Sequence, residues 1–316
     1  MKTLDNLKNF YDTELYPELT ELEQYRIIAK NKILIAGGII IPIAVILGIT
    51  VARSENGLFF VGIAAFLILA AIYKFATQDY VKNFKAGIIE KIVKFIDEHL
   101  SYSRTNHINQ SAFVESKIFT QRPEIFSGDD YVKGKIGQTA LEFSEIHAKY
   151  ITRDSKGRRQ EHTIFKGLFV IADFNKTFQG KTVVLPDTAE RLLGQFGSML
   201  QSINKSRGQL VKLEDPEFEK MFAVYGDDQI EARYILSTSL MKRIVDFKKS
   251  SNKTIHLSFV GSKINIAVSY TKDLFEPRVF RTLLDFTPIR EYFEDLKMAV
   301  SIVEDLNLNT RIWTKQ

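Results

Sequence analysis

Two apolar stretches, separated by a loop of six residues, lie near the start of the chain. The first runs over residues 33–51 and the second over 58–73, and neither contains a charged side chain. A helix needs roughly 20 residues, at about 1.5 Å each, to cross the hydrocarbon core of a bilayer. The sequence therefore predicts a hairpin of two membrane-spanning helices over residues 33–76. The short loop leaves no room for a domain on the far side.

Basic side chains gather at the outer ends of the two stretches, whereas the loop between them has only Arg53 beside Glu55. Lys and Arg are enriched in the cytoplasmic flanks of membrane helices. The pattern predicts that both termini lie in the cytoplasm. The flanking cations that we expect at the membrane surface are Lys30, Lys32, Lys74, Lys82 and Lys85.

Composition excludes several classes of function. The chain has no cysteine, which excludes disulfides, thiolate catalysis and cysteine-ligated metals. The net charge of +5 is too diffuse for a nucleic-acid-binding face. The five histidines lack a zinc-site spacing, and no Gly-x-Ser-x-Gly elbow is present. We therefore predict no catalytic residue, no metal site and no cofactor.

Hydrophobic periodicity divides the rest of the chain. Residues 1–32 have helical spacing and predict an amphipathic cytoplasmic helix, broken near Pro17. The helical pattern continues after the second span, with a possible kink near Gly87, so residues 77–112 are expected to form a juxtamembrane helix and a polar linker. Residues 113–316 are predicted to form a cytoplasmic domain.

The pattern in that domain changes to a period of two. Asp154 to Gly157 and Gly261-Ser262 predict the turns of two hairpins, and the return strand at 162–174 is apolar on both faces, as in a central strand. Helices fall between groups of strands. The predicted class is α+β, with a largely antiparallel sheet and flanking helices. One composite unit is favoured over two smaller ones, because no linker divides the region.

A segment at residues 175–182, NKTFQGKT, is similar to a phosphate-binding loop. Asparagine replaces its first glycine, and a strand rather than a helix follows it, so the amino end of a helix that should hold the phosphates is missing. A tight loop between strands is the favoured interpretation. The residues that remain as candidates for binding are Asp173, Asn175, Lys176, Gly180, Lys181 and Arg233, with Arg233 also expected as a buried ion-pair partner.

Other charged groups have two interpretations each. Arg153, Lys156, Arg158 and Arg159 crowd the predicted hairpin tip, as a solvated turn or as a contact for anionic lipid or an acidic partner. The pairs Asp129-Asp130 and Asp227-Asp228 are typical of turn and cap residues, with metal or acid–base chemistry as the alternative.

Several ordered motifs resemble a bacterial family of two-span membrane proteins of unknown function. They are Val132-Lys133-Gly134-Lys135-Ile136-Gly137, Phe165-Lys166-Gly167-Leu168-Phe169, Ala172 to Lys176, Gly180-Lys181-Thr182, Asp228 to Leu236 and Ile255 to Phe259. The resemblance implies an inner-membrane protein of a bacterial cell, brings no catalytic residues, and suggests a LemA-type membrane partner.

These observations favour a membrane-anchored cytoplasmic binding or scaffold module. The first alternative is a membrane-proximal enzyme that uses Asp173, Lys176 and Lys181, and the second is an accessory subunit of a transporter. The lipid bilayer is the expected partner. Small residues four apart at Ala44, Gly48 and Ala52 predict packing between the two spans or, alternatively, a homo-oligomer.

Overall fold

A computed structural model describes residues 2–51, 55–174, 176–187, 207–306 and 308. The chain forms two compact units. A helical unit contains Met1–Ile92 and Phe275–Phe293, and a sheet unit contains Val93–Leu274 and Glu294–Gln316. The sequence places residues 275–293 with the cytoplasmic domain, whereas the structure groups them with the N-terminal helices.

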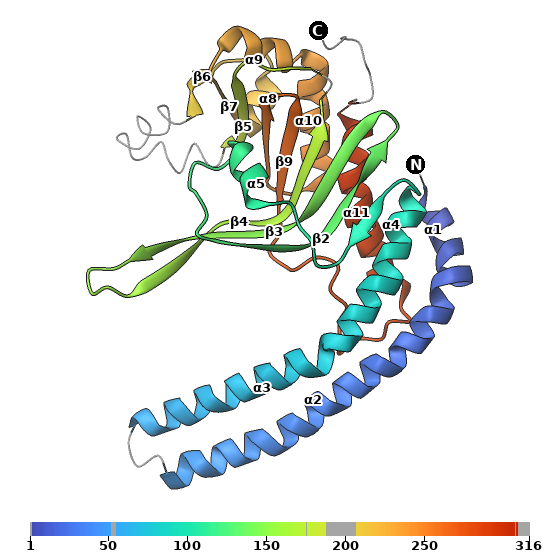
Figure 1. Cartoon of the computed structure of the whole chain (residues 1–316), viewed down its shortest axis with the longest axis vertical. Coiled ribbons are helices and arrows are strands. Elements are labelled where there is room, and N and C mark those ends of the chain that lie inside the picture. The colour runs from blue at the N-terminus through green and yellow to red at the C-terminus, as the bar shows by residue number, and fades with distance from the viewer. Residues whose placement is uncertain (1, 52–54, 175, 188–206, 307, 309–316) are drawn as a thin grey trace. The chain divides into compact units, whose positions relative to one another are not determined.

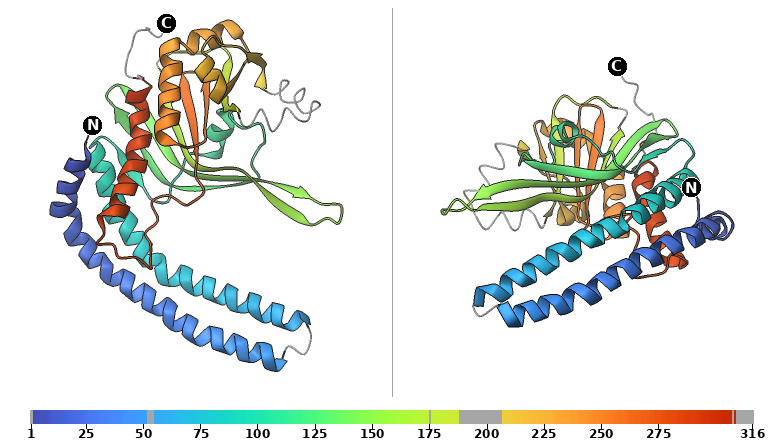
Figure 2. Two further views of the ribbon diagram at one scale, coloured as in Figure 1. Left: turned by 180° about the vertical axis from the view of Figure 1, so that it is seen from behind. Right: turned by 60° about the horizontal axis from the view of Figure 1, so that its bottom comes forward.

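The helical unit is built on two long helices that run side by side (Figures 1 and 2). Its elements are α1 (Leu4–Phe10), a π-helical turn (Tyr11–Leu15), α2 (Tyr16–Val51), α3 (Glu55–Phe84), a second π-helical turn (Lys85–Ile89) and the start of α4 (Glu90–Ile96). Both helices are long and apolar enough to cross a membrane, and only 6% and 0% of their most apolar segments is buried. Such exposure is not that of core helices in a soluble protein.

The predicted break near Pro17 takes the form of a π-helical interruption at Tyr11–Leu15. Helix α2 begins at Tyr16, one residue before Pro17, and the Tyr16 amide donates to the Tyr11 carbonyl five residues back. A π turn of this kind absorbs the change of register that a proline without an N–H imposes. The expected kink near Gly87 coincides with the second π turn. There, a Cβ on Gly87 would lie 2.3 Å from Glu18 Oε1, so α2 and this turn approach closely.

Among the described residues, the sheet unit has one antiparallel sheet of nine strands, which confirms the α+β class (Figure 1). Its order is β1-β2-β3-β4-β9-β8-β5-β7-β6. The strands are β1 (Ser101–Ser103), β2 (Ile125–Ile136), β3 (Thr139–Arg153), β4 (Arg159–Asp173), β5 (Lys181–Pro186), β6 (Gln209–Val211), β7 (Phe222–Gly226), β8 (Ile255–Val260) and β9 (Lys263–Ser269). The early strands β1 to β4 and the later strands β5 to β9 therefore belong to the same sheet, as the favoured prediction of one composite unit requires.

The edge of this sheet differs from the expectation. The predicted polar linker contributes edge strand β1 and helix α5 (Gln110–Glu115). A β-bulge lies in β2, where the register with β3 shifts between Asp129 and Val132, opposite Ser144. Gly134 of β2 lies where the backbone at His99 approaches too closely for a side chain.

Three helices lie between the later strands, within the described residues: α8 (Pro216–Met221), α9 (Gln229–Ile235) and α10 (Thr238–Ser251). Helix α11 (Phe286–Asp305) follows the last strand. The expected helix over residues 230–247 is interrupted between α9 and α10. From the spacing of the apolar residues 192–203 the sequence also predicts a helix after Asp187, which falls mostly on residues 188–206, outside the described residues. On one face of the sheet, Phe113 of α5 packs on Phe165 and Phe169 of β4, with ring centroids 6.2 and 5.1 Å apart.

Candidate functional site

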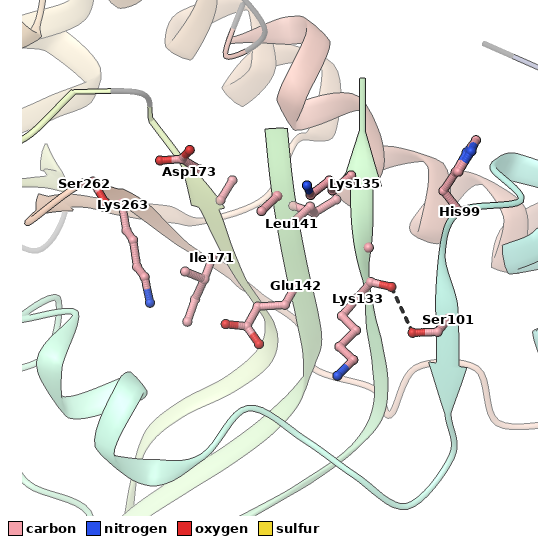
Figure 3. A pocket seen from close by; sticks show the side chains of 13 residues that line it. His99, Ser101, Lys133, Lys135, Leu141, Glu142, Ile171, Asp173, Ser262 and Lys263 are labelled. Carbon is pink, nitrogen blue, oxygen red and sulfur yellow. Dashed lines mark hydrogen bonds between the residues drawn. The ribbon is translucent and has the colours of Figure 1, made fainter. Parts of the chain in front are cut away.

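A groove of about 770 Å³ lies at one end of the sheet, where β1 to β4 meet the turn between β8 and β9 (Figure 3). Its charged and polar side chains are His99, Ser101, Lys133, Lys135, Glu142, Asp173, Ser262 and Lys263. Ile171, which is 4% exposed, lies between Glu142 and Lys263 and forms an apolar floor.

Cross-strand pairing explains why these side chains share one groove. Lys133 pairs with Glu142, Glu142 pairs with Ile171, and Asp173 pairs with Lys263. Directly paired residues of an antiparallel sheet project from the same face. The Ser101 hydroxyl donates to the Lys133 carbonyl at 3.0 Å and fixes edge strand β1 beside β2.

The ammonium groups of the groove are available for a ligand. Within the described part of the chain, Lys133, Lys135 and Lys263 have no ion pair and no side-chain hydrogen bond. The Glu142 carboxylate is engaged differently, because it accepts a hydrogen bond of 2.5 Å from the Tyr131 hydroxyl. Burial, with the hydrogen bond to Glu142, raises the pKa of Tyr131. The groove therefore offers cations beside an apolar floor.

The predicted loop before β5 binds the chain's own carboxylates. Glu231 of α9 accepts from the amides of Gln179 and Gly180 at 2.8 and 2.9 Å. The Lys181 amide donates to Asp227 at 3.2 Å, and its ammonium lies 3.1 Å from the same carboxylate. The amides that could bind the phosphates of a nucleotide are therefore already bound by Glu231 and Asp227. This arrangement favours a tight loop between strands over a nucleotide site.

The other predicted binding residues are dispersed. Asp173 lines the groove, Asn175 lies outside the described residues, and the Lys176 ammonium lies 4.2 Å from the centre of the Tyr234 ring. Burial lowers the pKa of Lys176. The expectation of a buried Arg233 is wrong: it is exposed, and it donates to the Lys212 carbonyl at 3.3 Å and to Gln229 at 3.4 Å.

The predicted membrane-surface cations also need one correction. Lys85 has a side chain only 2% exposed, and its ammonium lies 2.6 Å from Glu276. A buried and ion-paired ammonium does not face lipid headgroups, so Lys85 is not one of the membrane-surface cations. Lys32, Lys74 and Lys82 are exposed and Lys30 is half-buried.

The predicted basic hairpin tip is a two-stranded ribbon. Beyond Lys149, β3 pairs only with β4, so the tip extends past the neighbouring strands. Arg153 is exposed, whereas Arg158 pairs with Asp154 at 2.8 Å and Arg159 with Glu161 at 3.3 Å. Two of its cations therefore already have carboxylate partners.

Sequence reasoning named the pair Asp129-Asp130 but did not place Glu145 beside it, and the structure forms a cluster of these three carboxylates. Oxygens of Asp129, Asp130 and Glu145 lie within 4.8 Å of one another, at the level of the bulge in β2. Burial raises the pKa of Glu145 to about 8, and its carboxyl accepts from the Leu274 amide at 2.7 Å. Asp228, in contrast, caps α9 as expected, accepting from the amides of Ile230 and Glu231.

Comparisons with known proteins give a match to a family model over part of the chain, and they give no activity. No curated protein matches the chain. One solved structure, the crystal structure of the mycobacterial trehalose monomycolate transport factor A, TtfA, is similar at a TM-score of 0.33 and 8% identity, over 72% of this chain and 98% of that one. Residues 163–308 match the model of the family described as "Protein of unknown function (DUF3137)".

Proposed function

We propose that the chain is a membrane-anchored binding module, and that the groove of its sheet unit holds an anionic ligand with an apolar part. The observation that carries this proposal is the set of three ammonium groups without partners around Ile171, within the described residues. Opposite charges attract most where the cation is not already neutralised. A carboxylate, phosphate or sulfonate suits the lysines, and an aliphatic or aromatic portion suits the floor.

Anchoring is supported by the exposure of the two apolar helices. We expect the full-length protein to stay in the membrane fraction after an alkaline carbonate wash and to be released only by detergent. Recovery in the aqueous fraction without detergent would contradict it. A reporter fused after Gln316 tests the side on which the terminus lies, which we expect to be the cytoplasm of a bacterial cell.

Ligand binding is tested with anilinonaphthalene sulfonate, an anionic aromatic probe, on the full chain in phosphatidylcholine nanodiscs. We expect the Lys133→Gln, Lys263→Gln double variant to bind the probe more weakly. Losing two exposed ion pairs, each worth up to about 1 kcal/mol, weakens binding by roughly five- to thirtyfold. The affinity comes from a fluorescence titration corrected with empty nanodiscs.

Lys242 on α10 provides a matched control, because it is an exposed lysine outside the groove. Lys242→Gln changes the net charge without touching the groove, and it is expected to leave the affinity unchanged. Unaltered binding by the double variant, or an equal loss in the control, would refute a site at the groove.

The enzyme alternative receives no support from the geometry of its candidates. Asp173 lies in the groove, whereas Lys176 contacts Tyr234 and Lys181 pairs with Asp227. Protein partners, a LemA-type protein or a second copy included, are proposals that pull-down from detergent extracts tests. For the small residues of the first span, packing within the hairpin has a supporting contact: a Cβ on Gly48 would lie 2.9 Å from the Leu58 side chain.

A further inference from the structure

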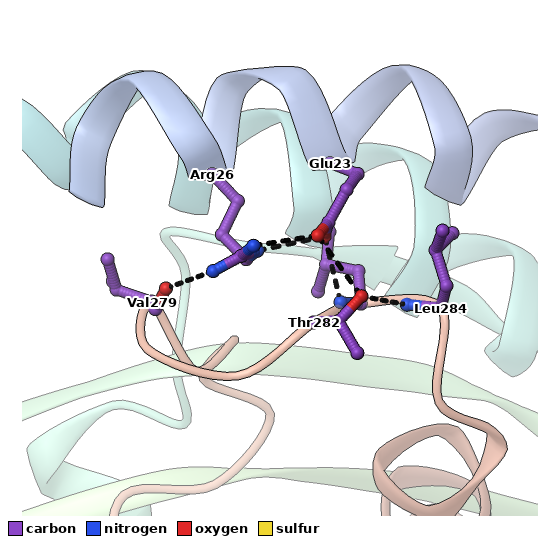
Figure 4. A network of polar contacts seen from close by, with 6 residues as sticks. Glu23, Arg26, Val279, Thr282 and Leu284 are labelled. Carbon is purple, nitrogen blue, oxygen red and sulfur yellow. Dashed lines mark hydrogen bonds and ion pairs between the residues drawn. The ribbon is translucent and has the colours of Figure 1, made fainter. Parts of the chain in front are cut away.

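The loop between Leu274 and α11 is fixed to α2 by a buried polar network (Figure 4). Arg26 donates to the Val279 carbonyl at 2.7 Å and to both oxygens of Glu23 at 2.7 and 2.9 Å. Glu23 in turn accepts from the Leu283 amide at 2.9 Å and the Thr282 hydroxyl at 3.1 Å. The loop therefore has a defined place on this helix.

The other end of the loop is fixed to the π turn that follows α3. Glu276 pairs with Lys85 at 2.6 Å, and its carbonyl accepts from the Tyr292 hydroxyl at 2.7 Å. Val279 and Leu283 are 3% and 5% exposed and pack inward. The loop thus connects α2 with the π turn that follows α3, and its tip, at Phe280 and Arg281, is exposed at the surface.

The contacts show in which direction the loop runs along the first π turn and α2. The Leu284 carbonyl is bound by the Tyr11 hydroxyl, Leu283 is bound by Glu23, and Val279 is bound by Arg26. The tip therefore lies at the end nearest the first apolar stretch. Arg26 comes seven residues before residue 33, which is about 10 Å along a helix.

Exposed apolar side chains continue to the level of that tip. Tyr25, Ile27 and Ile28 are 48%, 43% and 53% exposed on α2, although they precede the apolar stretch. Phe280, at the tip, is 57% exposed and is followed by the exposed Arg281. Aromatic rings and arginines are the side chains that occupy the boundary between headgroups and acyl chains.

We propose that the tip of this loop is a membrane-interface anchor, in which Phe280 inserts at the headgroup–acyl boundary and Arg281 contacts anionic headgroups. The inference rests on the anchoring of the chain by its two apolar helices. It adds a third point of membrane contact, some 200 residues farther along the sequence, about the distance between residues 73 and 280. Arg26 and Glu23 act here as positioning residues, because they hold the loop at that depth.

The single tryptophan of the chain makes the test direct. In a Trp313→Phe background, Phe280→Trp places one fluorophore at the tip. The full chain is reconstituted in phosphatidylcholine–phosphatidylglycerol vesicles whose acyl chains carry bromine near the headgroup. An interfacial ring lies roughly 5–10 Å into this boundary, so we expect strong quenching and a blue-shifted emission.

Tyr16→Trp in the same background is the matched control. Tyr16 is 43% exposed on the same helix, but it precedes residue 33 by 17 residues, or about 25 Å. The control is expected to show little quenching. Adding Arg281→Gln to the Phe280→Trp variant should reduce quenching in vesicles with phosphatidylglycerol more than in pure phosphatidylcholine.

The outcomes separate this proposal from the anchoring on which it rests. If the Phe280→Trp variant co-sediments with vesicles but is quenched no more than the control, the anchor proposal is overturned and the spanning helices are not. If the protein fails to reconstitute at all, both are overturned. Equal quenching with and without Arg281 would remove the arginine from the proposal and leave the ring.

Discussion

Replacing Gly167 with alanine is expected to prevent the sheet unit from reaching a stable fold. Gly167 has a φ of +146°, in the middle of β4. A Cβ there would lie 2.2 Å from the Val268 carbonyl oxygen and 2.8 Å from the Tyr270 amide nitrogen. Both atoms belong to the neighbouring backbone, which cannot move away because the Tyr270 amide donates to the Lys166 carbonyl at 3.0 Å.

The expected cost combines backbone strain with the separation of β4 from β9, and it exceeds about 3 kcal/mol. The measurement is thermal unfolding of the detergent-solubilised protein, together with its resistance to protease. Gly157→Ala is the control: φ is +76° at this hairpin turn, but nothing lies within 4 Å of the added Cβ. It should cost roughly 1–2 kcal/mol for the left-handed conformation alone. Equal effects of the two substitutions would show that the close approach at Gly167 is not what requires glycine.

Replacing Arg26 with methionine is expected to release the loop at 275–285 from α2. The side chains of Arg26 and Glu23 are only 9% and 13% exposed. Removing one member of a buried ion pair costs about 3–5 kcal/mol, because the remaining charge stays desolvated. Methionine keeps much of the packing volume, so the loss is mainly electrostatic. Hydrogen exchange of the Leu283 amide, which donates to Glu23, reports the release.

Acid provides a second measurement on the same network. Burial raises the pKa of Glu23, but the hydrogen bonds from Arg26, Leu283 and Thr282 outweigh it, so the net shift is downward. A lowered pKa in the folded state contributes stability above the unfolded value of 4.5, and that stability is lost as the pH falls through the folded value. Protection of the loop should therefore decrease in acid in the wild type, and less steeply in Glu23→Gln. The same acid dependence in both proteins would refute this role of Glu23.

Two glycines illustrate the difference between a motif that the sequence shows and its physical reason, which the sequence does not show. Gly134 and Gly167 stand in two of the segments that resemble the family, but no local pattern says why glycine is needed there. The structure supplies the reason, since a side chain at either position would collide with the backbone of a neighbouring segment, at His99 or at Val268. Contacts between residues far apart in sequence leave no periodicity, so sequence reasoning could not find them.

Of the residues that line the groove, only one, Asp173, was proposed from the sequence as a binding residue. Asp173 lines the groove, whereas Lys133, Lys135 and Lys263 were not proposed as ligand contacts. They come from strands β2 and β9, which lie on either side of β3 and β4 in the sheet. The alternation of apolar and polar residues within a strand predicts the face of the sheet on which a lysine lies. It does not predict which strands are neighbours in the sheet.

The sequence by itself determined the two apolar helices, the hairpins at Asp154 to Gly157 and Gly261-Ser262, and the α+β class. Each follows from hydrophobic spacing or turn chemistry within a few residues of the chain. The tertiary structure decided the strand order, the groove, the burial of Lys85 against Glu276 and the docking of the 275–285 loop on α2. These features depend on which distant surfaces bury one another, and that choice is made by packing and long-range pairing rather than by local propensity.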